Sequence, residues 1–182
     1  MRFSDTGIGG VKLVEPEVFG DRRGFFMETW QARKFAAAGL DLPFVQDNHS
    51  RSVQGTLRGL HYQLPQTQGK LMRVIAGEIY DVAVDLRRQS PTFGRCLGFI
   101  LSAENKKMLW VPPGCGHGFY VTSEVAEIVY KCTDYYAPEH EHTIRWDDPD
   151  LAVEWPLVAG RPPLLSGKDA KGKSLRDAVL FP

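Results

Sequence analysis

The chain has 182 residues, which is enough for one domain with a buried core. Hydrophobic residues make up 43% of it and charged residues 24%, as is ordinary for a globular protein. The 22 basic and 22 acidic residues cancel, and this balance argues against a general binder of nucleic acids or membrane surfaces. An anionic ligand would therefore need a local cationic pocket.

Compartment and redox state are indicated by what the sequence lacks. No apolar run approaches the ~20 residues of a membrane span, and the N-terminus has no apolar region of the signal-peptide kind. The three cysteines, Cys96, Cys115 and Cys132, include no CxxC pair. Free thiols in a reducing cytoplasm are therefore expected, and packing as small hydrophobic side chains is their simplest role.

The N-terminal quarter of the chain contains two strand signals and one helix signal. Residues 11–19 alternate loosely and predict a strand that closes at Gly20 and Asp21. Residues 25–30 predict a second strand, rich in aromatic side chains. Residues 31–40 are the best helix candidate, because three consecutive alanines are followed by Gly39.

Short strands dominate from Pro43 onward. Residues 70–75 and 78–86 flank Ala76 and Gly77, which predicts a hairpin. Further strands are expected at residues 98–102, 107–111, 118–121 and 124–133. Glycine and proline separate these strands at the spacing of a sandwich or barrel. The polar, proline-rich residues 137–182 are expected to lie over the domain as a tail, so the prediction is one all-β domain, 1–182, with minor helix.

A cluster of ionisable side chains lies between two predicted strands. Arg58, His61 and Lys70 fall within thirteen residues, and the functional interpretation is a base facing an anionic substrate. A packed core histidine beside solvated cations is the equally open alternative. Arg58 and His61 are three positions apart, so a regular strand would point them to opposite faces. If both serve one pocket, the strand must bulge or bend at Gly59.

Two glycine-bounded segments resemble the paired motifs of cupin barrels, which are double-stranded β-helices of the jelly-roll type. The first contains His61 and Gln63, and the second, residues 112–117, ends at His117. A metal-binding cupin takes two histidines and a carboxylate from its first motif, whereas here Gln63 replaces the second histidine. Two histidines are too few for a well-held catalytic metal. We therefore expect no metal and a free imidazole at His61.

A tyrosine on the last predicted strand is a second candidate. Tyr130 shares one face of residues 124–133 with Ala126, Ile128 and Cys132, and should point into the barrel. A core tyrosine with a locally satisfied hydroxyl is the simpler interpretation. A phenol is also a plausible general acid when its proton goes to a carbanion or enolate.

Cations and aromatic rings supply candidate contacts for a nucleotide. Arg23, Arg58, Lys70 and Lys168 all lie beside glycines or strand ends, and arginine forks suit pyrophosphate. For any single one of them a solvated surface role is more common. The sequence has neither a P-loop nor GxGxxG, so side chains would hold the nucleotide. Phe25, Phe26 and Tyr136 are candidate stacking surfaces for a base, with core packing the stronger expectation for the phenylalanines.

Longer motifs, in order from about residue 14 to residue 169, resemble the dTDP-4-dehydrorhamnose 3,5-epimerases. They are residues 44–50 (FVQDNHS), 57–63 (LRGLHYQ), 68–70 (QGK), 81–85 (DVAVD), 90–94 (SPTFG), 101–105 (LSAEN), 116–119 (GHGF), 144–149 (IRWDDP) and 165–169 (LSGKD). The resemblance implies a metal-free, cofactor-free isomerase that inverts carbons 3 and 5 of a dTDP-linked 4-keto-6-deoxy sugar. Its product is the precursor of L-rhamnose for polysaccharide synthesis.

The resemblance also carries roles onto matching positions. His61 would be the general base, Asp169 its partner, Tyr130 the general acid and Lys70 the stabiliser of the enolate oxygen. The implied substrate-binding residues are Arg23, Phe25, Glu28, Gln46, Asp47, Asn48, Arg58, Lys70, His117, Glu141 and Lys168. In this family Arg23 and Glu28 reach across a homodimer, which implies that N-terminal strands within about residues 1–50 are shared with the partner.

Three alternatives remain open at this point. A sibling enzyme could epimerise a single carbon or use another nucleotide sugar. A non-catalytic module could bind a sugar nucleotide, although it would have no use for His61, Tyr130 and Asp169 together. A metal-dependent cupin, such as a dioxygenase, would contain stoichiometric metal that is required for activity.

Overall fold

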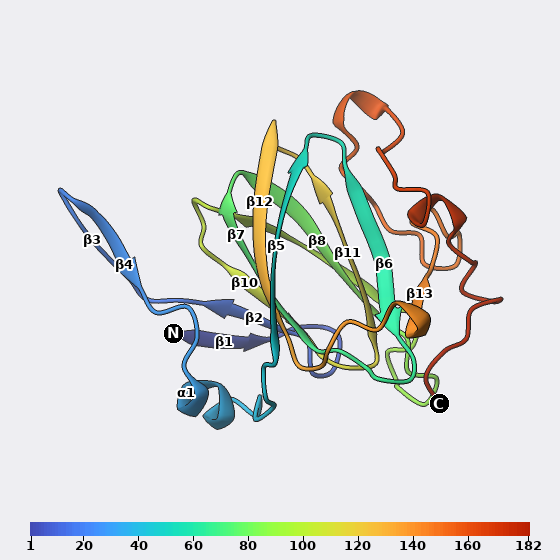
Figure 1. The fold of residues 1–182 in the computed structure, drawn as a ribbon, viewed down its shortest axis with the longest axis horizontal. Helices are drawn as coiled ribbons and strands as arrows, with labels where there is room; N and C mark the ends of the chain where they lie inside the picture. Colours follow the sequence, from blue (N-terminus) through green and yellow to red (C-terminus); the bar gives the residue numbers. More distant parts are fainter.

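All 182 residues, Met1 to Pro182, are described by the computed structural model. Two antiparallel sheets face each other, with one short α-helix and three 3₁₀ turns outside them (Figure 1). The six-stranded sheet has the order β1 (Arg2–Asp5), β2 (Lys12–Glu15), β10 (Met108–Val111), β7 (Lys70–Ala76), β12 (Val125–Cys132), β5 (Gln46–Val53). The five-stranded sheet has the order β13 (Glu141–Thr143), β6 (Leu57–Gln63), β11 (Cys115–Val121), β8 (Glu78–Asp85), β9 (Cys96–Ser102). The predicted all-β class is confirmed.

The N-terminal region differs from its prediction in three respects. β1 was not predicted, and the strand expected over residues 25–30 ends at Met27. Residues 11–19 form two strands, β2 and β3 (Val18–Asp21), because Pro16 has no N–H with which to continue a sheet. β3 pairs only with β4 (Gly24–Met27), and this hairpin projects away from both sheets (Figure 1). Helix α1 (Ala32–Ala37) lies within the predicted range, and the side chain of Gln31 caps its start.

The hairpin predicted at Ala76 and Gly77 is wrong. β7 and β8 follow each other directly but belong to different sheets, so Gly77 is a corner where the chain crosses between them. Gly77 has φ of +72°, and a Cβ there would lie 1.9 Å from the carbonyl oxygen of Val125. A glycine with positive φ suits a hairpin turn and a corner equally well, so the local pattern could not distinguish them.

Buried side chains form one core between the sheets and two smaller clusters outside them, one of which packs Phe35 of α1 against Leu71 and Trp110 of the six-stranded sheet. The inner core takes Ile79 and Phe119 from the five-stranded sheet and Met72 and Ile128 from the six-stranded sheet. The C-terminal tail covers the outer face of the five-stranded sheet, where residues such as Phe181 are buried. β8 is therefore buried on both faces, with its alternate residues in the two cores.

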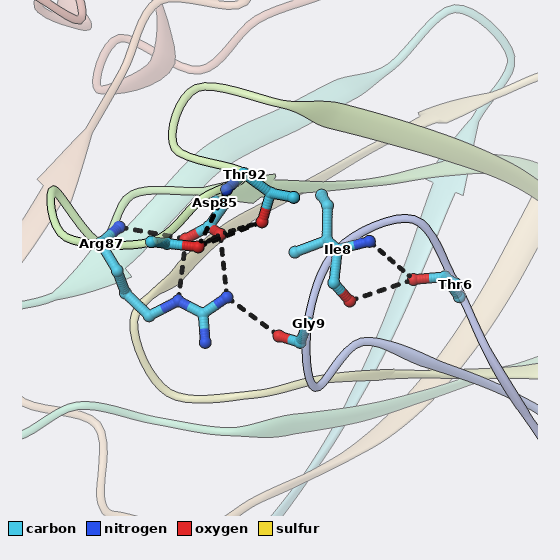
Figure 2. Close-up of polar contacts among 7 residues, drawn as sticks. Thr6, Ile8, Gly9, Asp85, Arg87 and Thr92 are labelled. Carbon is cyan, nitrogen blue, oxygen red and sulfur yellow. Dashed lines mark hydrogen bonds and ion pairs between the residues drawn. The ribbon is translucent and has the colours of Figure 1, made fainter.

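A buried carboxylate ties the N-terminal loop to the barrel. Asp85 accepts hydrogen bonds from Arg87, Ser90 and Thr92, and Arg87 also donates to the carbonyl of Gly9 at 2.9 Å (Figure 2). Burial alone would raise the pKa of Asp85, but these hydrogen bonds bring it down to about 2. The same loop places Ile8 in the inner core.

No helix of the chain has the length and apolar character needed to cross a bilayer. The three cysteines are free.

Candidate active site

A cavity of about 340 Å³ lies between the two sheets. Its lining comes from β5, β6, β7, β11 and β12, together with the loop before β7 and the segments that follow β12. Nine of the residues predicted for the site line it: Gln46, Asn48, Arg58, His61, Lys70, His117, Tyr130, Glu141 and Lys168. The fold thus gathers side chains from positions 46 to 168 around one space.

Arg58 and His61 both reach this cavity because β6 bulges between them. His61 lies opposite His117 on β11, and Arg58 lies opposite Phe119. Three steps along β6 therefore match two steps along β11, which is one extra residue on β6. Gly59 makes the bulge possible, since a Cβ there would lie 2.5 Å from the Cα of Gly118. The predicted irregularity at Gly59 is confirmed.

His61 forms a close pair with a carboxylate from the far end of the chain. Its Nε2 lies 2.5 Å from Oδ1 of Asp169, which also accepts the Gly59 N–H at 3.4 Å. The hydroxyl of Ser166 donates to the other oxygen, Oδ2, at 2.6 Å. Asp169 is 3% exposed and acts as acceptor on both oxygens. We therefore assign the ring proton to Nε2, which leaves the Nδ1 lone pair free to accept a proton.

Burial and hydrogen bonding shift the pKa values of His61 and Asp169 in opposite directions. Burial lowers the pKa of His61, and the hydrogen bond and charge of Asp169 oppose that fall. Burial would raise the pKa of Asp169, but hydrogen bonds from His61 and Ser166 bring it below its ordinary value. A neutral imidazole beside a charged carboxylate is the protonation state that a general base needs near neutral pH.

Tyr130 stands on the opposite wall of the cavity from His61. It lies on β12 in the six-stranded sheet, whereas His61 lies on β6 in the five-stranded sheet. Tyr130 shares its inward face with Ala126, Ile128 and Cys132, and this prediction of orientation is confirmed. Burial raises the pKa of Tyr130, so its phenol keeps its proton at neutral pH.

Lys70 lines the cavity at the start of β7, where it pairs in register with Cys132 on β12. Burial lowers the pKa of Lys70, and negative neighbours that include Glu141 oppose the fall. A cation with few solvent contacts interacts strongly with a developing oxyanion because little water screens it.

A second histidine–carboxylate pair lies at the back of the cavity. Nε2 of His117 is 2.7 Å from Oδ1 of Asp81, and both residues are buried. Oδ2 of Asp81 has no hydrogen-bond partner in the protein. His61 and His117 thus both use Nε2 on carboxylates, and no three His, Cys, Asp or Glu side chains are grouped as metal ligands. Independence from metal stays a prediction.

At the exposed end of the cavity, the carboxylate of Glu141 is hydrogen-bonded to two neighbouring side chains. Glu141 accepts hydrogen bonds from Nζ of Lys168 at 2.6 Å and from the hydroxyl of Tyr136 at 3.0 Å. Burial would raise the pKa of Glu141, but Lys168 and His61 bring it below its ordinary value. The three side chains therefore form a connected polar group at the opening.

Five predicted site residues do not line this cavity. One is Asp169, which contacts it only through its bond to His61. Arg23 and Phe25 are on the projecting hairpin, where Arg23 pairs with Asp21 at 2.5 Å. Glu28 pairs with Lys34 at 2.8 Å. Asp47 follows Gln46 on β5 and therefore points to the outer face, where it pairs with Lys131.

Several cavity residues were missed or left without a site role by sequence reasoning. They are Ser50, Gln68, Met72, Phe119 and Cys132. Asp81, which does not line the cavity but pairs with His117, was missed as well. Strand alternation could have found Ser50 beside Asn48, and Met72 beside Lys70, because each pair is two residues apart on one strand. Gln68 lies on an irregular segment with no such signal.

Comparison with known proteins gives a consistent family. The model of the dTDP-4-dehydrorhamnose 3,5-epimerase family matches residues 5–177. The chain is 57% identical over 183 residues to the dTDP-4-dehydrorhamnose 3,5-epimerase of Pseudomonas aeruginosa, with 100% of both chains covered.

Solved structures agree. The chain is 53% identical to the Legionella pneumophila dTDP-6-deoxy-D-glucose-3,5-epimerase, crystallised with dTDP-4-keto-L-rhamnose, with a TM-score of 0.94 over 98% of this chain and 94% of that one. A 3′-monoepimerase of Streptomyces bikiniensis in complex with dTDP-quinovose is 36% identical, with a TM-score of 0.87 over 94% and 86%. The cupin-like fold and the residue motifs thus agree with the comparisons, and the chain belongs to the dTDP-4-dehydrorhamnose 3,5-epimerase family, a family of isomerases.

Proposed function

We propose that this chain converts dTDP-4-dehydro-6-deoxy-D-glucose into dTDP-4-dehydro-L-rhamnose by inverting carbons 3 and 5 through an enolate. The observation that carries the proposal is the arrangement of His61 and Tyr130 on opposite sheets of one cavity, with half-buried Lys70 in its lining. Opposed donors and acceptors are what inversion requires, because a proton leaves one face of the sugar and another arrives on the other.

The chemistry of the substrate matches these side chains. A ketone at carbon 4 acidifies the hydrogens on carbons 3 and 5, and both deprotonations give an enolate with its charge on the same oxygen. Nδ1 of His61 would take the proton, and the Tyr130 hydroxyl would return one from the other side. Each acid or base role contributes roughly 10²–10⁴-fold to the rate. Lys70 would stabilise the enolate oxygen, and such electrostatic support is often the largest contribution.

The remaining predicted residues would hold the nucleotide and sugar. Arg58 and Lys168 present positive charge to the cavity and suit a pyrophosphate. Gln46, Asn48, Glu141 and His117 offer neutral and charged hydrogen-bonding groups around the same space, and suit the hydroxyls of a sugar and the edge of a base. A binder without catalytic activity would have no use for the opposed base and acid.

Incubation of the protein with the dTDP-linked 4-keto-6-deoxyglucose in deuterated water tests the activity. Two deuterium atoms, at carbons 3 and 5, and an L-configured product are expected. Deuterium at carbon 3 alone with inversion only there would instead assign a single-carbon epimerase. His61→Ala should abolish turnover while dTDP affinity stays within about twofold, and near-normal turnover would remove His61 from the base role. Activity should survive dialysis against EDTA, and stoichiometric metal required for turnover would contradict the metal-free mechanism.

A second copy of the chain would complete the site. The β3–β4 hairpin projects from the sheets (Figure 1). It carries three exposed phenylalanines, Phe19, Phe25 and Phe26, with 57%, 60% and 70% of their surface open. Exposed aromatic surface of this kind marks an interaction site. We propose that the hairpin docks on a partner subunit and brings Arg23 and Glu28 to the partner's cavity, where Phe25 would contact the substrate.

Mixing two inactive variants tests this sharing of sites. In a dimer that joins an Arg23→Ala subunit to a His61→Ala subunit, one shared site has both residues intact. Random reassociation should therefore recover roughly a quarter of wild-type activity. If Arg23 served its own subunit, both sites of the mixed dimer would stay inactive and no activity would return.

The nucleotide-sugar substrate suits a cytoplasmic location, and the three free cysteines favour a reducing compartment. We include this location in the proposal, and alkylation of all three thiols in protein extracted from cells under non-reducing, denaturing conditions would test it.

A further inference from the structure

An irregular segment lies at the opening of the cavity. Residues 133–137 follow β12, contain no helix or strand, and include Tyr136, which lines the cavity and is 50% exposed. We call this segment the strap. A strap without regular structure must still find partners for its N–H and C=O groups, because buried backbone groups left unpaired are costly.

Glutamine side chains supply most of these partners. Gln63 donates to the carbonyl of Tyr135 at 3.1 Å and accepts the N–H of Ala137 at 3.0 Å. Gln46 accepts the N–H of Tyr136 at 2.9 Å, and Gln68 donates to the carbonyl of Asp134 at 2.9 Å.

Gln63 holds the centre of this arrangement. It is 3% exposed, and its Nε2 makes a second bond, to the carbonyl of Gln66, at 2.8 Å. Its amide therefore clamps the strap on both sides of Tyr136 and links it to the loop after β6. Gln63 does not line the cavity, although it stands where a metal-binding cupin would have a histidine.

We propose that Gln63 is a positioning residue for the nucleotide end of the site. It would hold the strap so that the Tyr136 ring and the hydroxyl bonded to Glu141 meet the ligand in one arrangement. A contact surface ordered before binding loses less conformational entropy when the ligand arrives. The inference rests on the proposed function, because it takes the occupant of this end to be the nucleotide of a dTDP-linked substrate.

Gln63→Met tests the inference, because methionine keeps most of the length and volume but none of the three hydrogen bonds. The affinity for dTDP alone, measured by calorimetry, should fall by roughly 3- to 10-fold, while kcat at saturating substrate stays within about twofold. Hydrogen exchange at the Ala137 amide should accelerate. Gln54→Met is the matched control, because Gln54 donates one exposed hydrogen bond to the carbonyl of Thr122 outside the cavity.

Gln63→Glu is a second variant, whose effect depends on pH, for the case that the methionine variant does not fold. Only a protonated glutamic acid can donate to the carbonyl of Tyr135 or Gln66. The dTDP affinity of the Gln63→Glu variant, measured relative to wild type at each pH, should therefore recover as the pH falls from 8 to 6. Unchanged dTDP affinity despite faster exchange at Ala137 would overturn the inference, as would a fall in kcat without a change in affinity. Wild-type protein that does not bind dTDP would refute the proposed function instead.

Discussion

Replacing Asp169 by asparagine should slow turnover by roughly 10- to 150-fold and leave dTDP affinity nearly unchanged. Asparagine has the shape of aspartate and can still accept one hydrogen bond from Nε2 of His61. What it lacks is the negative charge that stabilises the imidazolium formed when His61 takes a proton. The variant therefore removes the charge of the pair while keeping its shape.

The magnitude follows from the geometry of the pair. The 2.5 Å contact between Nε2 and Oδ1 is short, and Asp169 is buried, so little water screens it. Hydrogen bonds to charged groups contribute about 1.5–3 kcal/mol, and each factor of ten in rate corresponds to about 1.4 kcal/mol. Loss of a favourable tautomer would add to this effect, since a similar change in a serine protease triad costs about 10⁴-fold.

The pH profile gives an independent check. If His61 is the general base, as proposed, it works only when neutral, so activity should rise as the pH increases through the pKa of His61. Burial lowers that pKa and Asp169 raises it, so removing the charge should move the acid limb of kcat to lower pH. Epimerisation followed by proton NMR at several pH values measures both effects, with Asp147→Asn, which breaks an exposed ion pair with Arg145, as control. A kcat within twofold of wild type, or an acid limb moved to higher pH, would refute the reasoning.

Two further predictions concern the acid and the stability of the fold. Tyr130→Phe should reduce net inversion more than deuterium exchange at carbon 3, because the base can still act without the opposed acid; equal losses would contradict that role. Asp85→Asn should lower the free energy of unfolding at pH 7 by about 2 kcal/mol, since the pKa of Asp85 is held near 2, below its value of about 3.9 in the unfolded chain. That stabilisation is complete above the unfolded pKa and is lost as the pH falls through 2. Urea denaturation should therefore show a difference in the free energy of unfolding between the wild type and the variant that becomes smaller below pH 4. A difference that does not change with pH would contradict the lowered pKa of Asp85.

Local patterns predicted some parts of the site well. The period of two along residues 124–133 correctly turned Tyr130 inward, because alternation is a property of the strand itself. The odd spacing of Arg58 and His61 likewise required the bulge at Gly59. Pro16, by contrast, was overlooked within an alternating segment, although its missing N–H was visible in the sequence.

Contacts between residues far apart in the sequence could not be predicted from local patterns. Asp169 approaches His61 across 108 positions, and nothing in strand alternation or composition joins them, so only the family resemblance suggested the pair. Asp81 belongs to the motif of residues 81–85, but no site role was predicted for it, because its place beside His117 depends on the register of β8 with β11. In the sequence, Gln63 was noted only because it replaces a histidine ligand of metal-binding cupins. Its hydrogen bonds to the strap are visible only in the folded chain.

The sequence by itself determined the all-β class, the inward faces of the strands and the long motifs that identify the family, because alternation, turn residues and motif identity are properties of neighbouring positions. The tertiary structure alone decided that β7 and β8 belong to different sheets, that His61 and Tyr130 stand on opposite walls, and that the hairpin with Arg23 lies outside its own cavity. These outcomes depend on which strands pair across long separations. Such pairing is set by the packing of the whole core, and a corner glycine such as Gly77 is compatible with more than one solution.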